Sequence, residues 1–444
     1  MVSAASSATA LVTGPVDGAR PPWGAPDVDV AALGYTVDEF DIEGSAGACQ
    51  LVADPTPDGR WQVEEFARAP YRTRLLVVRP IDAADFNGTV VVNWQNVSAG
   101  FEQGAPTAGE VYDGYAWVGV SAQEVGLYGF PSGLERMASR RGLPLLDYDP
   151  ARYDHLEHPG DPASFDIFTQ AGRALAGDRG GDVDPLGGLL VQRLIAVGGS
   201  QSAMRLVTYL NAFHESARVF DGFLLSVWEA RAPRPEEGLL PMGVRTAIRT
   251  DTPTPVIVVN SEFESTQLAQ VPCVDTEWLR VWEVAGTPHG NIRSLGNEPD
   301  RRGRVPNPLR YAPVHDAALR ALQHWLTDGV PAPHQSRIAM EPGARPRIAC
   351  DDAGNARGGI RLPELEMPTA TYQGAAMGTG HLPLFGAARP FDDDELRARY
   401  ASRAQYEEGW NAAVDALVES GALRPEDAPA MRARVADVHL PFPA

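Results

Sequence analysis

Short apolar runs alternate with amphipathic segments along most of this chain, and this alternation limits the possible folds more than any other feature. Several of the runs are apolar throughout, which is typical of strands that helices cover on both faces. Strands that alternate with helices indicate a mostly parallel central sheet flanked by helices. The sequence therefore predicts the α/β class, with strands at 72–78, 89–94, 115–122, 193–199, 221–227, 254–260 and 280–286.

Three segments have the apolar period of a helix. The segment 161–177 begins with Asp161, a good N-cap residue, and continues with Pro162, which is favoured in a first helical turn. The segments 201–214 and 314–329 each place their apolar residues on one face. We therefore expect a helix over each of the three segments.

The 444 residues are enough for one large domain with additions at both ends. We expect an N-terminal extension over 1–70 that adds strands at a sheet edge, and a core over 71–340. A C-terminal extension over 341–444 is expected to be irregular at first and helical at its end, where 392–437 has the pattern of two or three helices.

The stretch VGGSQSA, residues 197–203, joins a predicted strand to a predicted helix. It lacks the lysine of a phosphate-binding P-loop and the third glycine of a dinucleotide-binding loop. A nucleophile elbow, a tight turn that exposes one serine, requires small residues two before and two and three after that serine. Ser200 meets this requirement, whereas Ser202 would place the large Met204 at the last position. Ser200 is therefore the predicted nucleophile; the alternative is a buried serine in an ordinary loop.

A serine hydroxyl needs a base to attack at neutral pH, and the base needs a third group to orient it. In folds with a nucleophile elbow the acid and then the histidine follow the serine along the chain. His289 fits this order best, because it lies on a Gly- and Pro-rich loop just after a predicted strand. For the acid we favour Glu264 over Glu262, both on a loop after the strand 254–260. At a spacing of two residues, we expect one of them to face the site and the other the solvent.

The oxyanion formed by nucleophilic attack requires N–H donors that are already in place. One is expected from the backbone of Gln201, directly after the nucleophile. The other is expected from Asn96 or Val97, in the loop after the strand 89–94. Three residues expected in loops around the mouth of the pocket are candidate substrate contacts: Trp94, Gln123 and Tyr128.

The sequence resembles the α/β-hydrolase superfamily, and within it a family of large "α/β-hydrolase domain" proteins of bacteria and fungi. The resemblance covers roughly residues 72–375. The stretches that carry it are FNGTVVVNWQNVSAG, GYAWVGVSAQEVGLYG, HPGDPASFDIFTQAGRAL, LIAVGGSQSAMRLVTYLNAFH, TPVIVVNSEFES, WEVAGTPHGN and GNARGGIRLPELEMPTATYQG.

The resemblance implies an α/β-hydrolase fold and a serine esterase-like hydrolase with Ser200 as nucleophile and His289 as base. The chain has Glu264 where the family commonly has Asp, and Asn93-Trp94-Gln95-Asn96 where it often has Glu-Trp-Leu-Asn. We expect hydrolysis of a carboxylic ester through an acyl-enzyme, with no metal and no organic cofactor. The alternatives are an acyltransferase or thioesterase with the same triad, and a non-catalytic binding protein that kept the fold.

Charge and composition limit the partners. Thirty-eight Lys and Arg against 58 Asp and Glu give a net charge of −20, which argues against binding nucleic acid or an anionic membrane through a basic surface. The three separated cysteines suit a reducing compartment. No apolar stretch of ~18 residues is present, and the N-terminus makes a poor signal peptide. We expect a cytoplasmic protein that acts on a small-molecule ester, and we leave open whether it forms a homo-oligomer.

Overall fold

The computed structural model describes residues 9–132, 134, 142–238, 243–290, 304–343, 345–375 and 383–442. The chain divides into two compact units, Met1–Leu225 with Ala230–Val256 and Ser226–Glu229 with Ile257–Ala444. The first eight residues, on which the signal-peptide prediction partly depends, lie outside the described residues. Among the described residues, no helix combines the length and the hydropathy needed to cross a bilayer.

The first unit is built on a sheet with the strand order β1-β2-β3-β5-β4-β6-β7. The pairs β1–β2, β2–β3 and β3–β5 are antiparallel, whereas β4 pairs in parallel with both β5 and β6. The strands are β1 (Leu11–Thr13), β2 (Tyr35–Leu51), β3 (Val63–Pro80), β4 (Thr89–Trp94), β5 (Ala116–Val120), β6 (Arg193–Gly199) and β7 (Gly222–Ser226).

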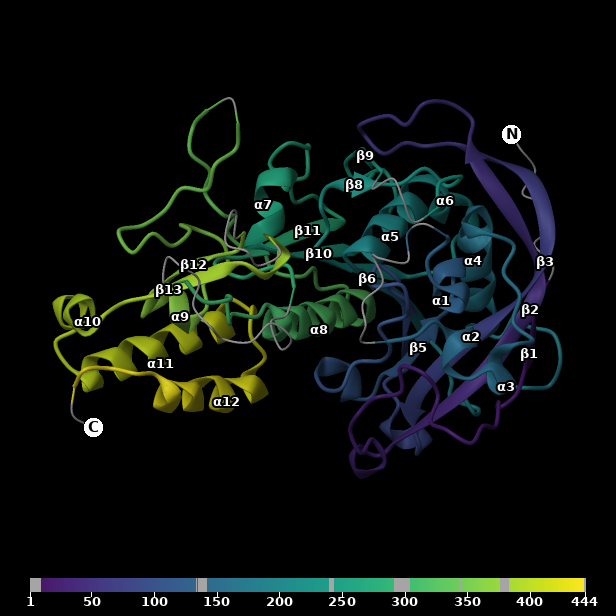
Figure 1. Ribbon diagram of the computed structural model, residues 1–444, viewed down its shortest axis with the longest axis horizontal. Helices are drawn as coiled ribbons and strands as arrows, with labels where there is room; N and C mark the ends of the chain where they lie inside the picture. The colour runs from purple at the N-terminus through teal and green to yellow at the C-terminus, as the bar shows by residue number, and fades with distance from the viewer. Residues whose placement is uncertain are drawn as a thin grey trace. The chain divides into compact units, whose positions relative to one another are not determined.

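The N-terminal strands form a long twisted ribbon, drawn in purple in Figure 1. Strand β2 pairs with β3 from Tyr35 opposite Pro80 to Leu51 opposite Val63. The predicted strand 72–78 is therefore only the inner part of β3, whose outer part continues beyond the buried region. The predictions of N-terminal strand additions and of a parallel sheet with helices are confirmed.

The parallel strands are buried on both faces, as their uninterrupted apolar sequences predict. Val90, Val91 and Val92 of β4 are each at most 3 % exposed. The α-helices of this unit are α1 (Glu124–Tyr128), α2 (Leu145–Tyr148), α3 (Pro150–Tyr153), α4 (Ser164–Leu175), α5 (Gln201–Ala212) and α6 (His214–Ala217). A small separate sheet pairs β8 (Arg231–Ala232) with β9 (Val244–Arg245).

The prediction that Asp161 caps a helix is wrong. A 3-10 turn, Asp161–Ala163, precedes α4, and Ala163 occupies the N-cap position. The Asp161 carboxylate instead contacts three groups from other parts of the unit, which are described below. A local pattern cannot reveal this use of an aspartate, because its partners are distant in sequence.

In the second unit, β10 (Val256–Ser261) and β11 (Leu279–Val284) are neighbouring strands, and β12 (Ala370–Gln373) pairs antiparallel with β13 (Ala387–Pro390). The long helix α8 (Ala312–Asp328) is followed by the C-cap residue Gly329, whose φ of +69° is the left-handed conformation that glycine adopts most readily. The C-terminal part is helical, as predicted (Figure 1). The helices of this unit are α7 (Glu262–Leu268), α8 (Ala312–Asp328), α9 (Pro363–Glu366), α10 (Asp393–Arg399), α11 (Arg403–Glu419) and α12 (Ala428–Ala433).

Candidate active site

Ser200 occupies a strained turn between β6 and α5. Its φ of +57° and ψ of −119° lie outside the regions that a non-glycine residue ordinarily adopts. Such a conformation costs on the order of 1–3 kcal/mol and persists only where the surroundings enforce it. A Cβ added at Gly198 would lie 2.9 Å from Leu206 Cδ1 and 3.0 Å from the backbone carbon of Ser202. The small residue required two positions before the serine is therefore explained by crowding against α5.

Hydrogen bonds from neighbouring side chains stabilise this turn. Ser202 Oγ accepts a hydrogen bond from the Gly199 N–H and donates one to the Gly199 carbonyl, both at 2.9 Å. The side-chain amide of Asn96 donates to the same carbonyl at 2.8 Å. Ser202 thus serves the turn itself, consistent with the choice of Ser200 as the candidate nucleophile.

The expected oxyanion-hole residues come together in the first unit. Gln201 is the first residue of α5, and the hydrogen bond from Asn96 to Gly199 ties the loop after β4 to the turn that carries Ser200. Val97 is 1 % exposed and packs with Val125 and Phe130. The loop is therefore held at both residues from which a backbone donor is expected.

The expected loop position of Trp94 is wrong. Trp94 ends β4, is fully buried, and packs its ring 4.9 Å from that of Phe168. Gln123 precedes α1 and is 1 % exposed. Tyr128 is the partly exposed member of the three candidates, at 44 %, and its hydroxyl accepts a hydrogen bond from the His158 N–H. Tyr128 is the last residue of α1 rather than part of a loop, so its expected loop position is wrong as well, and its role as a substrate contact stays a prediction.

His289 and Glu264 form a buried pair in the second unit. Nδ1 of His289 lies 2.5 Å from Oε1 of Glu264, a carboxylate that is fully buried. The other carboxylate oxygen, Oε2, accepts hydrogen bonds from the Ser261 N–H at 2.9 Å and from the Ser261 hydroxyl at 2.6 Å. The carboxylate is thus fixed from one side and directed at the imidazole from the other.

The prediction that Glu262 and Glu264 lie on a loop, one facing solvent, is wrong. Strand β10 passes directly into α7, with Ser261 as the N-cap and Glu264 closing a capping box. Both carboxylates are buried. Glu262 accepts backbone N–H groups from Gly286 at 2.7 Å and from Gly374 at 2.8 Å. Glu262 therefore joins the start of the histidine loop to a segment far along the chain.

Glu264 and burial act on His289 in opposite directions. Burial is the largest single influence and lowers the pKa of the imidazole. The hydrogen bond and charge of Glu264, together with the charge of Glu229, outweigh burial and raise the pKa of His289 above its ordinary value of 6.5. The arrangement stabilises the protonated ring, which is the state that a general base reaches after taking a proton.

We expect Glu262→Gln to lower the free energy of unfolding by about 1–3 kcal/mol, because a glutamine offers a single acceptor oxygen and one of the two buried N–H groups would face an NH₂ donor. Denaturant unfolding followed by tryptophan fluorescence measures the change. The matched control is Glu366→Gln, which removes a half-exposed partner of Arg361 and should cost less than about 1 kcal/mol. Equal stability of the wild type and Glu262→Gln would contradict the role assigned to Glu262.

Ser200 belongs to the first unit, and the pair of His289 and Glu264 belongs to the second. The transfer of a proton from the serine to the histidine stays a prediction.

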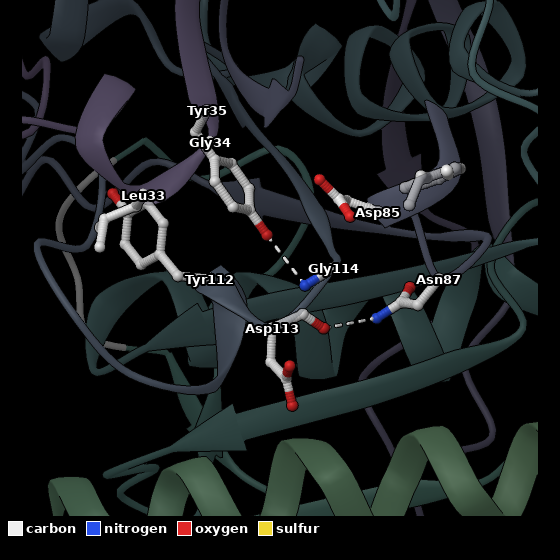
Figure 2. A pocket seen from close by; sticks show the side chains of 10 residues that line it. Leu33, Gly34, Tyr35, Asp85, Asn87, Tyr112, Asp113 and Gly114 are labelled. Atoms are coloured by element: carbon white, nitrogen blue, oxygen red, sulfur yellow. Dashed lines mark hydrogen bonds between the residues drawn. The ribbon is translucent and has the colours of Figure 1, made fainter. Parts of the chain in front are cut away.

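A surface pocket of about 440 Å³ lies elsewhere in the first unit. Its walls include Tyr35, whose hydroxyl accepts the Gly114 N–H at 2.9 Å, and Asn87, whose amide donates to the Asp113 carbonyl at 3.1 Å (Figure 2). None of the predicted site residues lines this pocket. The predicted chemistry therefore does not extend to it.

Sequence reasoning missed a set of buried polar contacts beside the Ser200 turn. The carboxylate of Asp161 accepts hydrogen bonds from Gln123 Nε2 at 3.0 Å and from the Glu124 N–H at 3.1 Å, and it pairs with Arg205 at 3.0 Å. An arginine within an amphipathic helix is the one signal that could have drawn attention to α5, because a guanidinium on a buried face needs a carboxylate.

The family model described as alpha/beta hydrolase domain matches residues 12–433. No curated protein matches the chain in sequence. Among solved structures, the chain is similar to esterase Est22 with p-nitrophenol (12 % identity, 58 % of this chain, 74 % of that chain, TM-score 0.31). It is also similar to a fungal esterase from Rhizomucor miehei (12 %, 65 %, 85 %, 0.31) and to oligopeptidase B from Leishmania major (11 %, 56 %, 40 %, 0.27).

The family model, and not these structural similarities, identifies the family of this chain. That model extends over nearly the whole chain, including the strained serine turn and the buried histidine–glutamate pair. The chain therefore belongs to the alpha/beta hydrolase domain family.

Proposed function

We propose that this protein is a serine hydrolase that cleaves a carboxylic ester through an acyl-enzyme. Membership of the alpha/beta hydrolase domain family supports hydrolase activity in general. The observation that carries the more specific proposal is the backbone of Ser200, held at a φ of +57° between a strand and a helix. A fold retains such strain where it serves a site, and a turn of this kind presents a serine hydroxyl for attack.

In the first half of the reaction, His289 Nε2 takes the proton from Ser200 Oγ as the oxygen attacks the ester carbonyl carbon. Glu264 holds the proton on Nδ1 and stabilises the imidazolium that forms. Negative charge moves to the carbonyl oxygen, where the backbone N–H of Gln201 and that of Asn96 or Val97 stabilise it. The tetrahedral intermediate then expels the alcohol, which takes the proton from His289 and leaves an acyl group on Ser200.

In the second half, His289 takes a proton from water as the water oxygen attacks the acyl carbon. The second tetrahedral intermediate collapses, the Ser200–acyl bond breaks, and Ser200 recovers its proton from His289. The products are one carboxylic acid and one alcohol. Every proton transfer uses groups of the protein, the substrate and water.

The decisive experiment is labelling with a fluorophosphonate, which reacts with activated serines and forms a stable adduct. We expect the wild type and Ser202→Ala to be labelled and Ser200→Ala to remain unlabelled, because Ser202 serves the turn and Ser200 is the nucleophile. Intact-mass spectrometry identifies the adduct and peptide mapping locates it. A wild type that takes up no label would exclude the enzyme and favour a binding protein with this fold.

Hydrolysis and acyl transfer share every step up to the acyl-enzyme. A panel of esters that differ in acyl length gives the preferred acyl group, and alcohols and amines added to the same reaction compete with water for the acyl-enzyme. Formation of the acid alone supports the hydrolase proposed here. Transfer to an added acceptor at the expense of the acid would assign the chain to acyltransferases.

The pH dependence of kcat/KM provides a separate prediction. The protonated imidazole cannot accept the serine proton, so activity falls as the pH drops below the pKa of His289. Since Glu264 and Glu229 raise this pKa, we expect the acid limb above pH 6.5. Glu229→Gln removes one of the raising charges and should move the limb to lower pH without lowering the plateau. An acid limb that is the same in both proteins would contradict the electrostatic role of Glu229.

A further inference from the structure

A buried group of polar side chains lies next to the Ser200 turn within the first unit. Its most exposed member is Gln201, at 7 %, and the others are almost fully buried. Buried polar groups of this kind are expensive unless each is hydrogen-bonded. The group consists of Trp94, Gln123, Asp161, Gln201 and Arg205.

The orientation of the Gln123 amide is fixed by its partners. Asp161 Oδ2 only accepts hydrogen bonds when ionised, so the nitrogen of the Gln123 amide must face it, at 3.0 Å. The amide oxygen then faces two donors, Trp94 Nε1 at 2.9 Å and Gln201 Nε2 at 2.7 Å. Gln123 therefore cannot flip without losing all three hydrogen bonds.

Asp161 is itself fixed by Arg205. The guanidinium lies 3.0 Å from Asp161 Oδ2 and donates to the carbonyls of Glu237 at 2.9 Å and Gly238 at 2.6 Å. Arg205 follows Gln201 by four residues, so both project from the same face of α5. The first two turns of this helix are thus attached to Gln123 and Asp161 at two points.

The side chain of Gln201 depends on Gln123 for its position. Its Nε2 donates to Gln123, while its Oε1 is buried without a hydrogen-bond partner among the residues that the structure describes. Loss of the bond to Gln123 would leave both polar atoms of this amide without a partner. Because an unsatisfied buried amide is costly, we expect this side chain to move toward solvent in such a variant and to shift the backbone at the start of α5.

We propose that Gln123 is a positioning residue that holds Gln201, and through it the backbone N–H expected to stabilise the oxyanion. The inference rests on the proposed function and assigns Gln123 and Trp94 to support of the site rather than to substrate contact. Asp161 and Arg205 determine which way Gln123 points. Loss of Gln123 is therefore expected to raise the free energy of the transition state without weakening substrate binding.

The test replaces Gln123 with methionine, which has a similar shape and cannot hydrogen-bond. We expect kcat for the best ester of the panel to fall about tenfold to a hundredfold, less than the loss of a whole oxyanion donor. KM should stay unchanged, and the inhibition constant of a boronic acid, which forms a tetrahedral adduct with the serine, should rise by the same factor as kcat falls.

Gln170→Met is the matched control. Gln170 is 1 % exposed on α4, donates to the Ser45 carbonyl and accepts from the Tyr71 hydroxyl, both at 3.0 Å. The same chemical change there should lower the melting temperature and leave kcat, KM and boronic acid affinity unchanged. If Gln123→Met keeps the wild-type kcat, or if the control loses as much, the positioning role is overturned.

Gln201→Met alone provides a second measurement should Gln123→Met fold poorly, and the double variant completes a mutant cycle when both single variants fold. Gln201→Met cuts the same hydrogen bond from its other end, so it should reproduce the loss in kcat, and the double variant should lose no more than the larger single loss. Additive losses would overturn the proposal. A wild type that neither hydrolyses esters nor takes up the phosphonate overturns the proposed function as well, whereas an active wild type with an unaffected Gln123→Met overturns the positioning role alone.

Discussion

Ser200→Ala is expected to lower kcat for ester hydrolysis about 10⁶-fold, the size of loss seen when the nucleophile of a serine hydrolase is removed. The acyl-enzyme cannot form, and only binding and oxyanion stabilisation remain to accelerate direct attack by water. Alanine also removes a hydroxyl without enlarging the side chain, so the turn between β6 and α5 can keep its backbone. Steady-state kinetics on the preferred ester measure the loss.

Ser202→Ala is the control for this experiment. Ser202 Oγ makes two hydrogen bonds to Gly199, so its loss weakens the turn without removing the attacking atom. We expect a stability loss of about 1 kcal/mol and a kcat far closer to that of the wild type. Comparable activity in Ser200→Ala and the wild type would rule out the mechanism, and inactivity of Ser202→Ala alone would move the nucleophile to position 202.

Glu264→Gln is expected to lower kcat about 10⁴-fold, as the same acid-to-amide change does in the serine proteases. The Ser261 N–H lies 2.9 Å from Glu264 Oε2 and requires an oxygen at that place. The amide NH₂ of a glutamine would therefore face Nδ1 of His289, which lies 2.5 Å from Oε1 in the wild type. Nδ1 would then accept rather than donate, and the ring proton would move to Nε2, the atom that must act as the base.

Glu262→Gln tests whether the two glutamates differ as the structure indicates. It makes the same chemical change two residues away, on a carboxylate that binds Gly286 and Gly374 rather than the imidazole. We expect a loss of kcat at least a hundredfold smaller than that of Glu264→Gln. Equal losses in the two variants would show that support of the loop, and not orientation of the imidazole, accounts for the effect of Glu264.

Much of the fold could be predicted because its strands are defined by local sequence. The run TVVVNW forms β4 over Thr89–Trp94 and RLIAVGG forms β6 over Arg193–Gly199, each with the predicted bounds. Continuous apolar character reports burial on both faces, which the surrounding helices then provide. The small residues around Ser200 are equally local, since the crowding at Gly198 arises within the same turn.

The exposure of the two glutamates could not be predicted from their spacing. An alternation of inward and outward side chains holds for a strand or a loop that continues it, but the chain turns into α7 immediately after Ser261. Residues at the first and third positions of a short helix do not lie on opposite faces of a sheet. Burial of Glu262 further depends on Gly374, and no local pattern connects these two positions.

The positions of Trp94 and Gln123 depend on partners from separate segments. Trp94 packs between Phe165 and Phe168 of α4, and Gln123 depends on Asp161. The sequence analysis expected both in loops around the mouth of the pocket, whereas Trp94 ends β4 and both side chains are buried. Local sequence predicts where along a strand a residue lies. The burial of its side chain depends on which other parts of the chain pack against it.

Hydrogen bonds to the backbone around Gly374 limit how far proteins of this kind can be truncated and which of their segments can be exchanged between homologues. A fragment ending before Gln373 would keep Ser200, Glu264 and His289, yet Glu262 would lose the Gly374 N–H, one of its two N–H donors, and Asn307 would lose the Gln373 carbonyl. We therefore expect the smallest fragment that keeps the proposed activity to be longer than the span of the predicted catalytic residues. Chimaeras that graft the histidine loop of one homologue onto the tail of another should inherit a mismatch at this junction unless both parts are exchanged together.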